Sequence, residues 1–321
     1  MAVQLHVAFS KLFHAAAIYA GGPFDCAGGS FDGAMTCASG GANLARLLAT
    51  TDRWSAQAAI DPVSNLKGES AYLWSGSLDR MVERPVMNQL QTFYQHYGVA
   101  TAYEKSFPAG HGWESPYGQG ACGATQIPFM IACGTYDSER AWLERFLGPL
   151  RPKNSGALLG RLVPFDQSEF ASPAAKMDRR GWVFIPQSCG VGGRCKLVVA
   201  LHGCLQNGSL AGNTFARQAG INEWADTNDI IVLYPGAAVS WNNPAGCWDW
   251  WGYTGPAYSQ KNAPQMSAIV SMVERIEAGQ KNGPVLATGQ LPNRREKVST
   301  PFLTQGLTAS ALRLPEPSSR R

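Results

Sequence analysis

Two side chains in the first third of the chain could act together as an acid–base pair. Asp79 follows a predicted buried strand in the segment Gly-Ser-Leu-Asp-Arg-Met-Val, and His111 follows the next predicted strand in Ala-Gly-His-Gly-Trp. An imidazole held by a carboxylate can take a proton from a hydroxyl nucleophile and return it to a leaving alcohol. Each residue alone has an ordinary explanation, since Asp is a common turn former and loop His residues usually lie at the surface. Together they have the order expected for the last two members of a hydrolase triad.

A third feature could supply a backbone hydrogen-bond donor. The run Leu197 to Leu201 is almost entirely apolar, which predicts a strand buried on both faces, and it stops at His202-Gly203. In α/β enzymes the carboxyl end of such a strand presents N–H groups to the ligand, and a His-Gly turn there is typical of an oxyanion hole. We therefore expect this turn to lie at an active-site edge.

A serine nucleophile is not apparent in the chain. No Gly-x-Ser-x-Gly elbow occurs in the sequence, and Ser39, in Ala-Ser-Gly-Gly, is interpreted as a loop serine because no buried strand leads into it. The first segments predict a helix and then a strand from His14, the elements that would follow an elbow. We therefore expect an elbow ahead of Met1, so that the chain as written lacks its nucleophile.

Eight cysteines occur as neighbours in pairs and predict disulfides. The sequential pairing is one of about 105 possible connectivities, but it closes three short loops at small entropic cost. It indicates an oxidising, extracellular or periplasmic compartment, although no signal peptide is recognisable. Buried free thiols in a cytosolic enzyme are the alternative. Zinc is disfavoured because no Cys-x-x-Cys occurs and no His stands at ligand spacing. The expected pairs are Cys26–Cys37, Cys122–Cys133, Cys189–Cys195 and Cys204–Cys247.

Composition predicts one large α/β domain followed by a tail. The chain has 321 residues, of which 45% are hydrophobic, but it contains no apolar run long enough for a transmembrane helix. The net charge of +4 comes from the region beyond residue 280, which is basic, polar and without periodicity. We expect a domain over 1–280, a disordered tail over 281–321, and no nucleic-acid or membrane partner.

The remaining patterns predict alternating strands and helices with a mostly parallel sheet and helices on both faces. Residues 148–180 are rich in Gly, Pro and Ser and predict a long connection with at most short strands. The expected strands cover 70–74, 100–105, 182–185 and 229–234, in addition to those near 14–19 and 197–201. The expected helices cover 86–97, 138–147, 215–227 and 265–279, with an amphipathic stretch at 43–50.

Five longer motifs carry a family resemblance. They are Tyr19-Ala-Gly-Gly-Pro-Phe-Asp-Cys26, Val86-Met-Asn-Gln-Leu90, His202-Gly-Cys-Leu-Gln206, Trp224-Ala-Asp-Thr-Asn228 and Asn243-Pro-Ala-Gly-Cys-Trp-Asp-Trp250. Together they resemble the secreted poly(3-hydroxybutyrate) (PHB) depolymerases of the single-domain, circularly permuted α/β-hydrolase type. The resemblance runs from Met1 to about Gly279. In that family the permuted chain begins with a strand and an elbow of the form Gly-Leu-Ser-Ser-Gly-Gly-Tyr, followed by Met-Ala.

The resemblance implies an acyl-serine mechanism without cofactor or metal. Asp79 resembles the triad acid and His111 the triad base, whereas the N–H of Cys204 resembles an oxyanion-hole donor. Trp250 resembles the aromatic wall that grips the polyester chain. His202 is interpreted as a structural residue of its turn. The substrate implied is a polyester polymer or oligomer, and the protein is expected to be a monomer.

Two rival interpretations stay open. One keeps the enzyme class and changes the substrate to short-chain, feruloyl or acetyl-xylan esters. The other is a non-catalytic, polymer-binding protein that has the cleft but no serine. Release of 3-hydroxybutyrate oligomers from polymer film would distinguish the first interpretation from both rivals.

Overall fold

The computed structural model describes residues 1–189 and 195–282, which belong to one compact unit that begins at Met1. The predicted tail lies outside these residues except for the end of the last helix. Within them the helices are α1 Ala2–Ala8, α2 Phe31–Ala38, α3 Leu44–Ala56, α4 Arg84–His96, α5 Ser138–Leu147, α6 Gly208–Ala211, α7 Thr214–Gln218, α8 Ile221–Asn228 and α9 Pro264–Asn282. The strands are β1 Ala15–Tyr19, β2 Ser70–Trp74, β3 Ala100–Glu104, β4 Trp113–Glu114, β5 Gly120–Ala121, β6 Met130–Ala132, β7 Arg161–Asp166, β8 Arg180–Ile185, β9 Lys196–Val199 and β10 Ile230–Tyr234.

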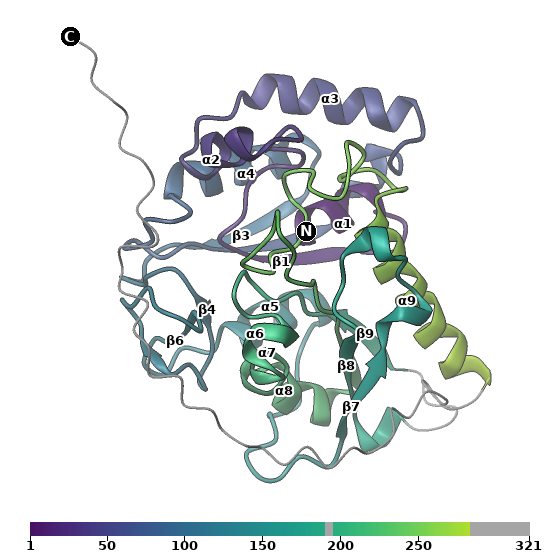
Figure 1. Ribbon diagram of the computed structural model, residues 1–321. Coiled ribbons are helices and arrows are strands. Elements are labelled where there is room, and N and C mark those ends of the chain that lie inside the picture. Colours follow the sequence, from purple (N-terminus) through teal and green to yellow (C-terminus); the bar gives the residue numbers. More distant parts are fainter. Residues whose placement is uncertain (190–194, 283–321) are drawn as a thin grey trace. The chain divides into compact units, whose positions relative to one another are not determined.

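The first sheet is parallel and carries the predicted acid and histidine at its carboxyl ends. Its order is β1-β2-β3, with Ser70 of β2 opposite both Ala15 and Ala100. The central strand β2 is buried from Ala71 to Trp74, because sheet neighbours and helices cover it. Helix α4 connects β2 to β3, which is the crossover that parallel neighbours require. Figure 1 shows this sheet near helices α2, α3 and α4.

The second sheet corrects one prediction about the strand at 197–201. Its order is β7-β8-β10-β9, with β9 and β10 parallel and the other pairs antiparallel. The fully buried strand is β10, whereas β9 ends at Val199 and is only partly buried. Strand β9 pairs only with β10 among the described residues, so it is an edge strand. Both of its faces pack against the core, Val198 on one side and Leu197 and Val199 on the other, but these side chains are only partly buried, so the prediction of full burial was wrong. Apolar composition did not reveal which strands would be its neighbours.

The helix predicted over 215–227 is in fact two helices. Gly220 has a φ of +77° and separates α7 from α8, because a left-handed residue ends a right-handed helix. The helix at 138–147 is present as expected, with the Asp137 side chain accepting a hydrogen bond from Arg140 N. The segment 148–180 contains the six-residue strand β7. Helix α2 and the small sheet β4-β6-β5 were not predicted.

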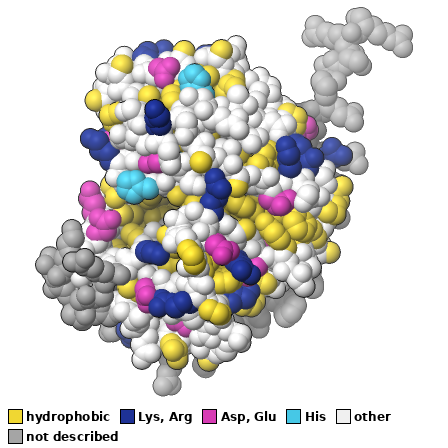
Figure 2. Space-filling model, turned by 180° about the vertical axis from the view of Figure 1, so that it is seen from behind, with side chains coloured by type: hydrophobic (Ala, Val, Ile, Leu, Met, Phe, Trp, Pro, Cys, Tyr) yellow, Lys and Arg dark blue, Asp and Glu magenta, His cyan; other side chains and the backbone are white. Residues whose placement is uncertain are grey.

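The surface supports the expectation of a nearly neutral domain. In the described part of the face shown in Figure 2, cationic and anionic side chains are interspersed among hydrophobic ones. Among the described helices, none combines the length and the apolar character that crossing a bilayer requires.

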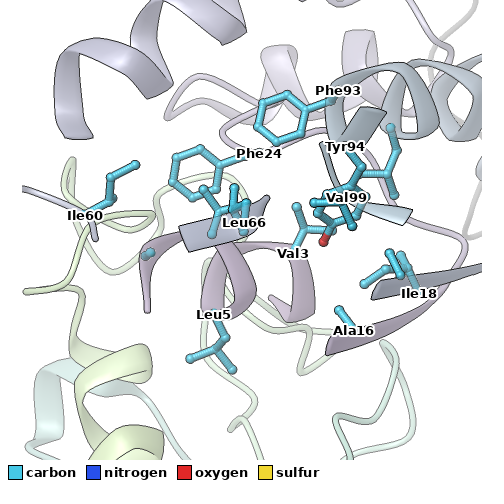
Figure 3. Packing of buried hydrophobic residues seen from close by; sticks show 14 of the residues in the cluster. Val3, Leu5, Ala16, Ile18, Phe24, Ile60, Leu66, Phe93, Tyr94 and Val99 are labelled. Atoms are coloured by element: carbon cyan, nitrogen blue, oxygen red, sulfur yellow. The ribbon is translucent and has the colours of Figure 1, made fainter. Parts of the chain in front are cut away.

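The core beside the first sheet is built around α1. Residues Val3 to Ala8 are all buried, which marks a helix enclosed on every side. Figure 3 shows Val3 and Leu5 with Ile18 of β1, Phe93 of α4 and other members of this cluster. His6 is buried as well, and its ring is bonded to Tyr94 Oη and to Glu69 Oε2. This histidine therefore has a structural role in joining α1 to α4.

All four predicted disulfides are present. The pairs are Cys26–Cys37, Cys122–Cys133, Cys189–Cys195 and Cys204–Cys247. The last of these joins the segment after β9 to a loop 43 residues further along the chain.

Candidate active site

Asp79 lies in the turn that follows β2, with its carboxylate buried and fully bonded. Its side chain is 5% exposed. Oδ1 accepts hydrogen bonds from Met81 N at 2.8 Å and Val82 N at 2.9 Å, and Oδ2 contacts His111 Nδ1 at 2.9 Å. The two backbone donors fix the orientation of the carboxylate, and the second oxygen is thereby directed at the imidazole.

The turns that carry Asp79 and His111 are joined through their backbones. Ser77 N donates to Phe107 O, and Leu78 N donates to Ala109 O, both at 2.9 Å. A Cβ on Gly76 would lie only 2.1 Å from Ala109 O, so the turns can approach this closely only because residue 76 is glycine. The glycine in the Asp79 motif therefore has a specific packing role.

The contact with Asp79 determines the tautomer of His111. An ionised carboxylate can only accept, so Nδ1 carries the proton and Nε2 presents its lone pair. The His111 side chain is 23% exposed, and its ring meets Phe129 edge-to-face with centroids 5.7 Å apart. An imidazole in this state can act as a general base at Nε2. None of the described serines forms a hydrogen bond with it.

The turn after β9 leaves the amide of Cys204 available. Gly203 N donates to Gln206 Oε1 at 2.6 Å, Leu205 N to Ala245 O at 2.7 Å, and Gln206 N to Gly203 O at 3.3 Å. The N–H of Cys204 has no acceptor within the part of the chain that the structure describes. Cys204 itself is exposed. A free amide between bonded ones is the arrangement that an oxyanion-hole donor needs.

His202 joins this turn to the segment after β10. It is 5% exposed, its Nδ1 donates to Gly203 O at 2.7 Å, and its Nε2 accepts from Ala237 N at 3.0 Å. Burial lowers the pKa of the imidazole to about 4, while the bond to Gly203 acts in the opposite direction. The ring is therefore neutral at neutral pH, as its acceptor role toward Ala237 requires.

The turn of Cys204 is linked to that of His111 through an intermediate loop. Gln206 Nε2 donates to Pro128 O at 2.8 Å and to Phe129 O at 3.0 Å. Since Phe129 packs on the His111 ring, the predicted oxyanion turn and the predicted base share one supporting segment.

Trp250 lies on the side of the site where Asp79 is held. It is partly buried and packs against the Cys26–Cys37 disulfide cluster, as does Val82, whose N–H binds Asp79. The loop that follows Trp250 is organised by one buried carboxylate that the sequence interpretation missed. Asp249 accepts hydrogen bonds from the N–H groups of four successive residues, at 3.3, 2.7, 3.0 and 2.8 Å for Trp251, Gly252, Tyr253 and Thr254.

The sequence also offered no prediction for a buried acid that contacts the segment after His111. Glu139 is fully buried, and its Oε1 accepts from Trp113 Nε1 at 3.0 Å. Burial, and then the charge of the nearby Glu114, raises the pKa of Glu139 well above its usual range. Its position at the start of α5, two residues after the helix cap, is the only signal in the sequence, and it predicts nothing about Trp113.

No three His, Cys, Asp or Glu side chains of the described residues converge in a way that could hold a metal ion.

Comparisons with known proteins point to one family. A model of the family described as esterase PHB depolymerase matches residues 182–283. The chain is 41% identical over 288 residues to the poly(3-hydroxybutyrate) depolymerase of Delftia acidovorans, an alignment that covers 87% of this chain and 58% of that protein. It is 37% identical over 298 residues to the polyhydroxybutyrate depolymerase of Talaromyces funiculosus, with 87% and 86% coverage.

Two solved structures are similar over most of their length. The crystal structure of PHB depolymerase from Penicillium funiculosum superposes with a TM-score of 0.78 at 34% identity, and a PHB depolymerase variant complexed with an R3HB trimer does so with 0.78 at 35%. Each alignment covers 86% of this chain and 91% of the other. The chain thus spans nearly the whole of these structures but little more than half of the Delftia protein.

Proposed function

Because the chain belongs to the PHB depolymerase family of esterases, we propose that it hydrolyses the ester bonds of poly(3-hydroxybutyrate) and related polyhydroxyalkanoates. The relatives named above are PHB depolymerases, and one solved relative is complexed with an R3HB trimer. The observation that carries the proposal is the 2.9 Å contact between Asp79 Oδ2 and His111 Nδ1. The turn of Cys204 is bonded through Gln206 to the segment whose Phe129 packs on the His111 ring.

The proposed reaction is acyl transfer through a serine. His111 Nε2 accepts the proton of a serine hydroxyl as its oxygen attacks the ester carbonyl, and the Cys204 N–H stabilises the negative oxygen of the tetrahedral intermediate. The imidazolium then donates its proton to the departing alcohol, and Asp79 stabilises its charge. Water, activated by the same imidazole, releases the acid. Removing an oxyanion-hole donor costs about 3 kcal/mol of transition-state stabilisation in comparable enzymes.

Apolar surface around the site supports a polyester substrate. Leu78 and Met81, which flank Asp79, are 47% and 52% exposed, and Trp250 packs against the same cluster as Val82 of that turn. A chain of methyl and ester groups has no charge to pair, so it is bound best by such side chains. The four disulfides support an extracellular or periplasmic location.

The test compares two polypeptides, because the mechanism requires a serine at His111. One is the 321-residue chain, and the other has the elbow Gly-Leu-Ser-Ser-Gly-Gly-Tyr joined ahead of Met1. Each is incubated with PHB film and, separately, with feruloylated xylan. We expect soluble 3-hydroxybutyrate oligomers from film with the polypeptide that carries the elbow, little or none without the elbow, and little ferulate from xylan with either.

Other outcomes of this assay would support the rival functions. Release of ferulate without release from film would assign the site to another ester class. Adsorption of both polypeptides to film with no soluble product would assign it to polymer binding, which the lack of a described serine bonded to His111 favours.

A further inference from the structure

The side chain of Gln206 joins two loops that are almost 80 residues apart in the sequence. It is 5% exposed, and all of its hydrogen bonds to the backbone run to these loops. Its Oε1 accepts from Gly203 N at 2.6 Å in the oxyanion turn, and its Nε2 donates to Pro128 O and Phe129 O. A buried amide whose oxygen is bonded to one loop and whose nitrogen is bonded to another fixes the distance between the two loops.

The second of these loops, at Pro128 and Phe129, contacts the imidazole of His111 and the backbone next to it. Phe129 O accepts not only from Gln206 Nε2 but also from Trp113 N, at 2.8 Å, and Trp113 is only two residues from His111. The Phe129 ring meets the His111 ring edge-to-face at 5.7 Å. The position of Phe129 therefore determines both the backbone course after His111 and one face of its ring.

Both loops carry a residue in a conformation that needs support. Phe129 has a φ of +55° and Leu205 a φ of +63°, values that side chains other than glycine seldom adopt. Such conformations persist where the surroundings hold them, and they cluster at functional sites. Here a hydrogen bond holds each of the two residues. Phe129 O accepts from Gln206 Nε2, and Leu205, the residue before Gln206, donates its N–H to Ala245 O.

From these contacts we propose that Gln206 is a positioning residue that sets the Cys204 amide relative to His111. By occupying Gly203 N–H it leaves Cys204 N–H as the available donor of the turn. By binding Pro128 O and Phe129 O it places that turn against the support of the imidazole. The inference rests on the proposed esterase function, because it assigns the alignment of two groups that act in one reaction.

The decisive variant is Gln206→Glu. It keeps an oxygen for Gly203 N–H but loses both donor bonds and places a carboxylate against two carbonyl oxygens. Gln167→Glu is the matched control, because Gln167 is also buried, accepts from Gly236 N and donates to Asp178 O and Gly236 O. Both variants lose comparable hydrogen bonds, so a similar fall in melting temperature is expected from both.

Two readouts separate positioning from stability. In ¹H–¹⁵N NMR spectra of the 321-residue chain, Gln206→Glu should move the His111 ring and Cys204 amide resonances, whereas Gln167→Glu should leave them in place. In p-nitrophenyl butyrate hydrolysis, measured with the polypeptide, with or without the elbow, that turns the ester over, Gln206→Glu should lower kcat by about 10- to 100-fold with little change in KM, the loss typical of a misaligned site.

The NMR result decides the inference even where the proposed function fails. Absence of turnover by both wild-type polypeptides, with and without the elbow, would count against the esterase proposal alone. Unchanged His111 and Cys204 resonances in Gln206→Glu, or equal shifts in Gln167→Glu, would overturn the positioning role.

Discussion

The buried imidazole of His202 makes the stability of the folded protein depend on pH. The folded protein holds this group with a pKa of about 4, against 6.5 for an ordinary histidine. Between these values the unfolded chain binds a proton that the folded chain does not, so the free energy of unfolding falls as the pH decreases from 6.5 to 4. Below pH 4 both states are protonated and the loss stops.

The size of the effect follows from the difference between the two pKa values. At about 1.4 kcal/mol per pKa unit, the full loss is about 3 kcal/mol, of which about 2 kcal/mol is reached by pH 5. The residue is only 5% exposed, so solvent screening reduces this little. Protonation would also remove the acceptor at Nε2 and leave Ala237 N without its partner.

Urea unfolding at a series of pH values between 7.5 and 4.5 measures this loss. His202→Gln removes the titration while offering a side-chain oxygen to Ala237 N, so its stability should decline less with acid than that of the wild type, by about 2 kcal/mol at pH 5. His96→Gln is the control, since His96 is exposed. Parallel pH profiles for the wild type and His202→Gln would refute the reasoning.

Two further predictions concern stability. The pKa of Glu139 is raised mainly by burial, so the folded state keeps the acid protonated after the unfolded chain has lost the proton. The free energy of unfolding therefore falls as the pH rises from the ordinary value of 4.5 toward the raised pKa. Glu139→Gln should flatten the decline in melting temperature above pH 4.5, and an unchanged decline would contradict this. Replacing Cys204 and Cys247 by Ser should lower the free energy of unfolding by about 4 kcal/mol, whereas the same change at Cys189 and Cys195 should lower it by about 2 kcal/mol. The difference is expected because the first disulfide spans 43 residues and the second spans 6. Equal losses in urea titrations would contradict the chain-entropy account.

Local sequence patterns were sufficient for features that depend on neighbouring residues. Three of the four disulfides join cysteines no more than 11 residues apart, and the apolar runs located the strands that precede Asp79 and His111. Gly220 was a local signal for a break, because glycine often ends a helix. The amphipathic pattern continues on both sides of it, and for this reason one helix was predicted instead of two.

Features that depend on distant partners were not predictable in this way. The edge position of β9 is set by pairing with β10, about 30 residues away. Gln206 finds its acceptors 77 and 78 residues earlier in the chain, and Glu139 binds the indole of Trp113 across 26 residues. A polar side chain gives no sign in the sequence of which backbone groups it will meet.

In the site, too, some residues could be predicted from their local sequence and others could not. Asp79 and His111 stand out because each follows a strand and is flanked by turn residues. The Asp249 carboxylate shapes the loop after Trp250, yet nothing in its local pattern separates it from an ordinary loop Asp.

The central claim, that Asp79 and His111 form the acid–base pair of an esterase, is tested most directly by Asp79→Asn. The amide can no longer hold the imidazole in the Nδ1–H tautomer, and in comparable triads this lowers kcat by about 10⁴-fold while the structure is kept. The measurement is hydrolysis of p-nitrophenyl butyrate at neutral pH by the polypeptide, with or without the elbow, that turns it over. A loss of about 10⁴-fold with an unchanged fold is the predicted result. A variant within tenfold of the parent, or no turnover by either parent polypeptide, would contradict the claim.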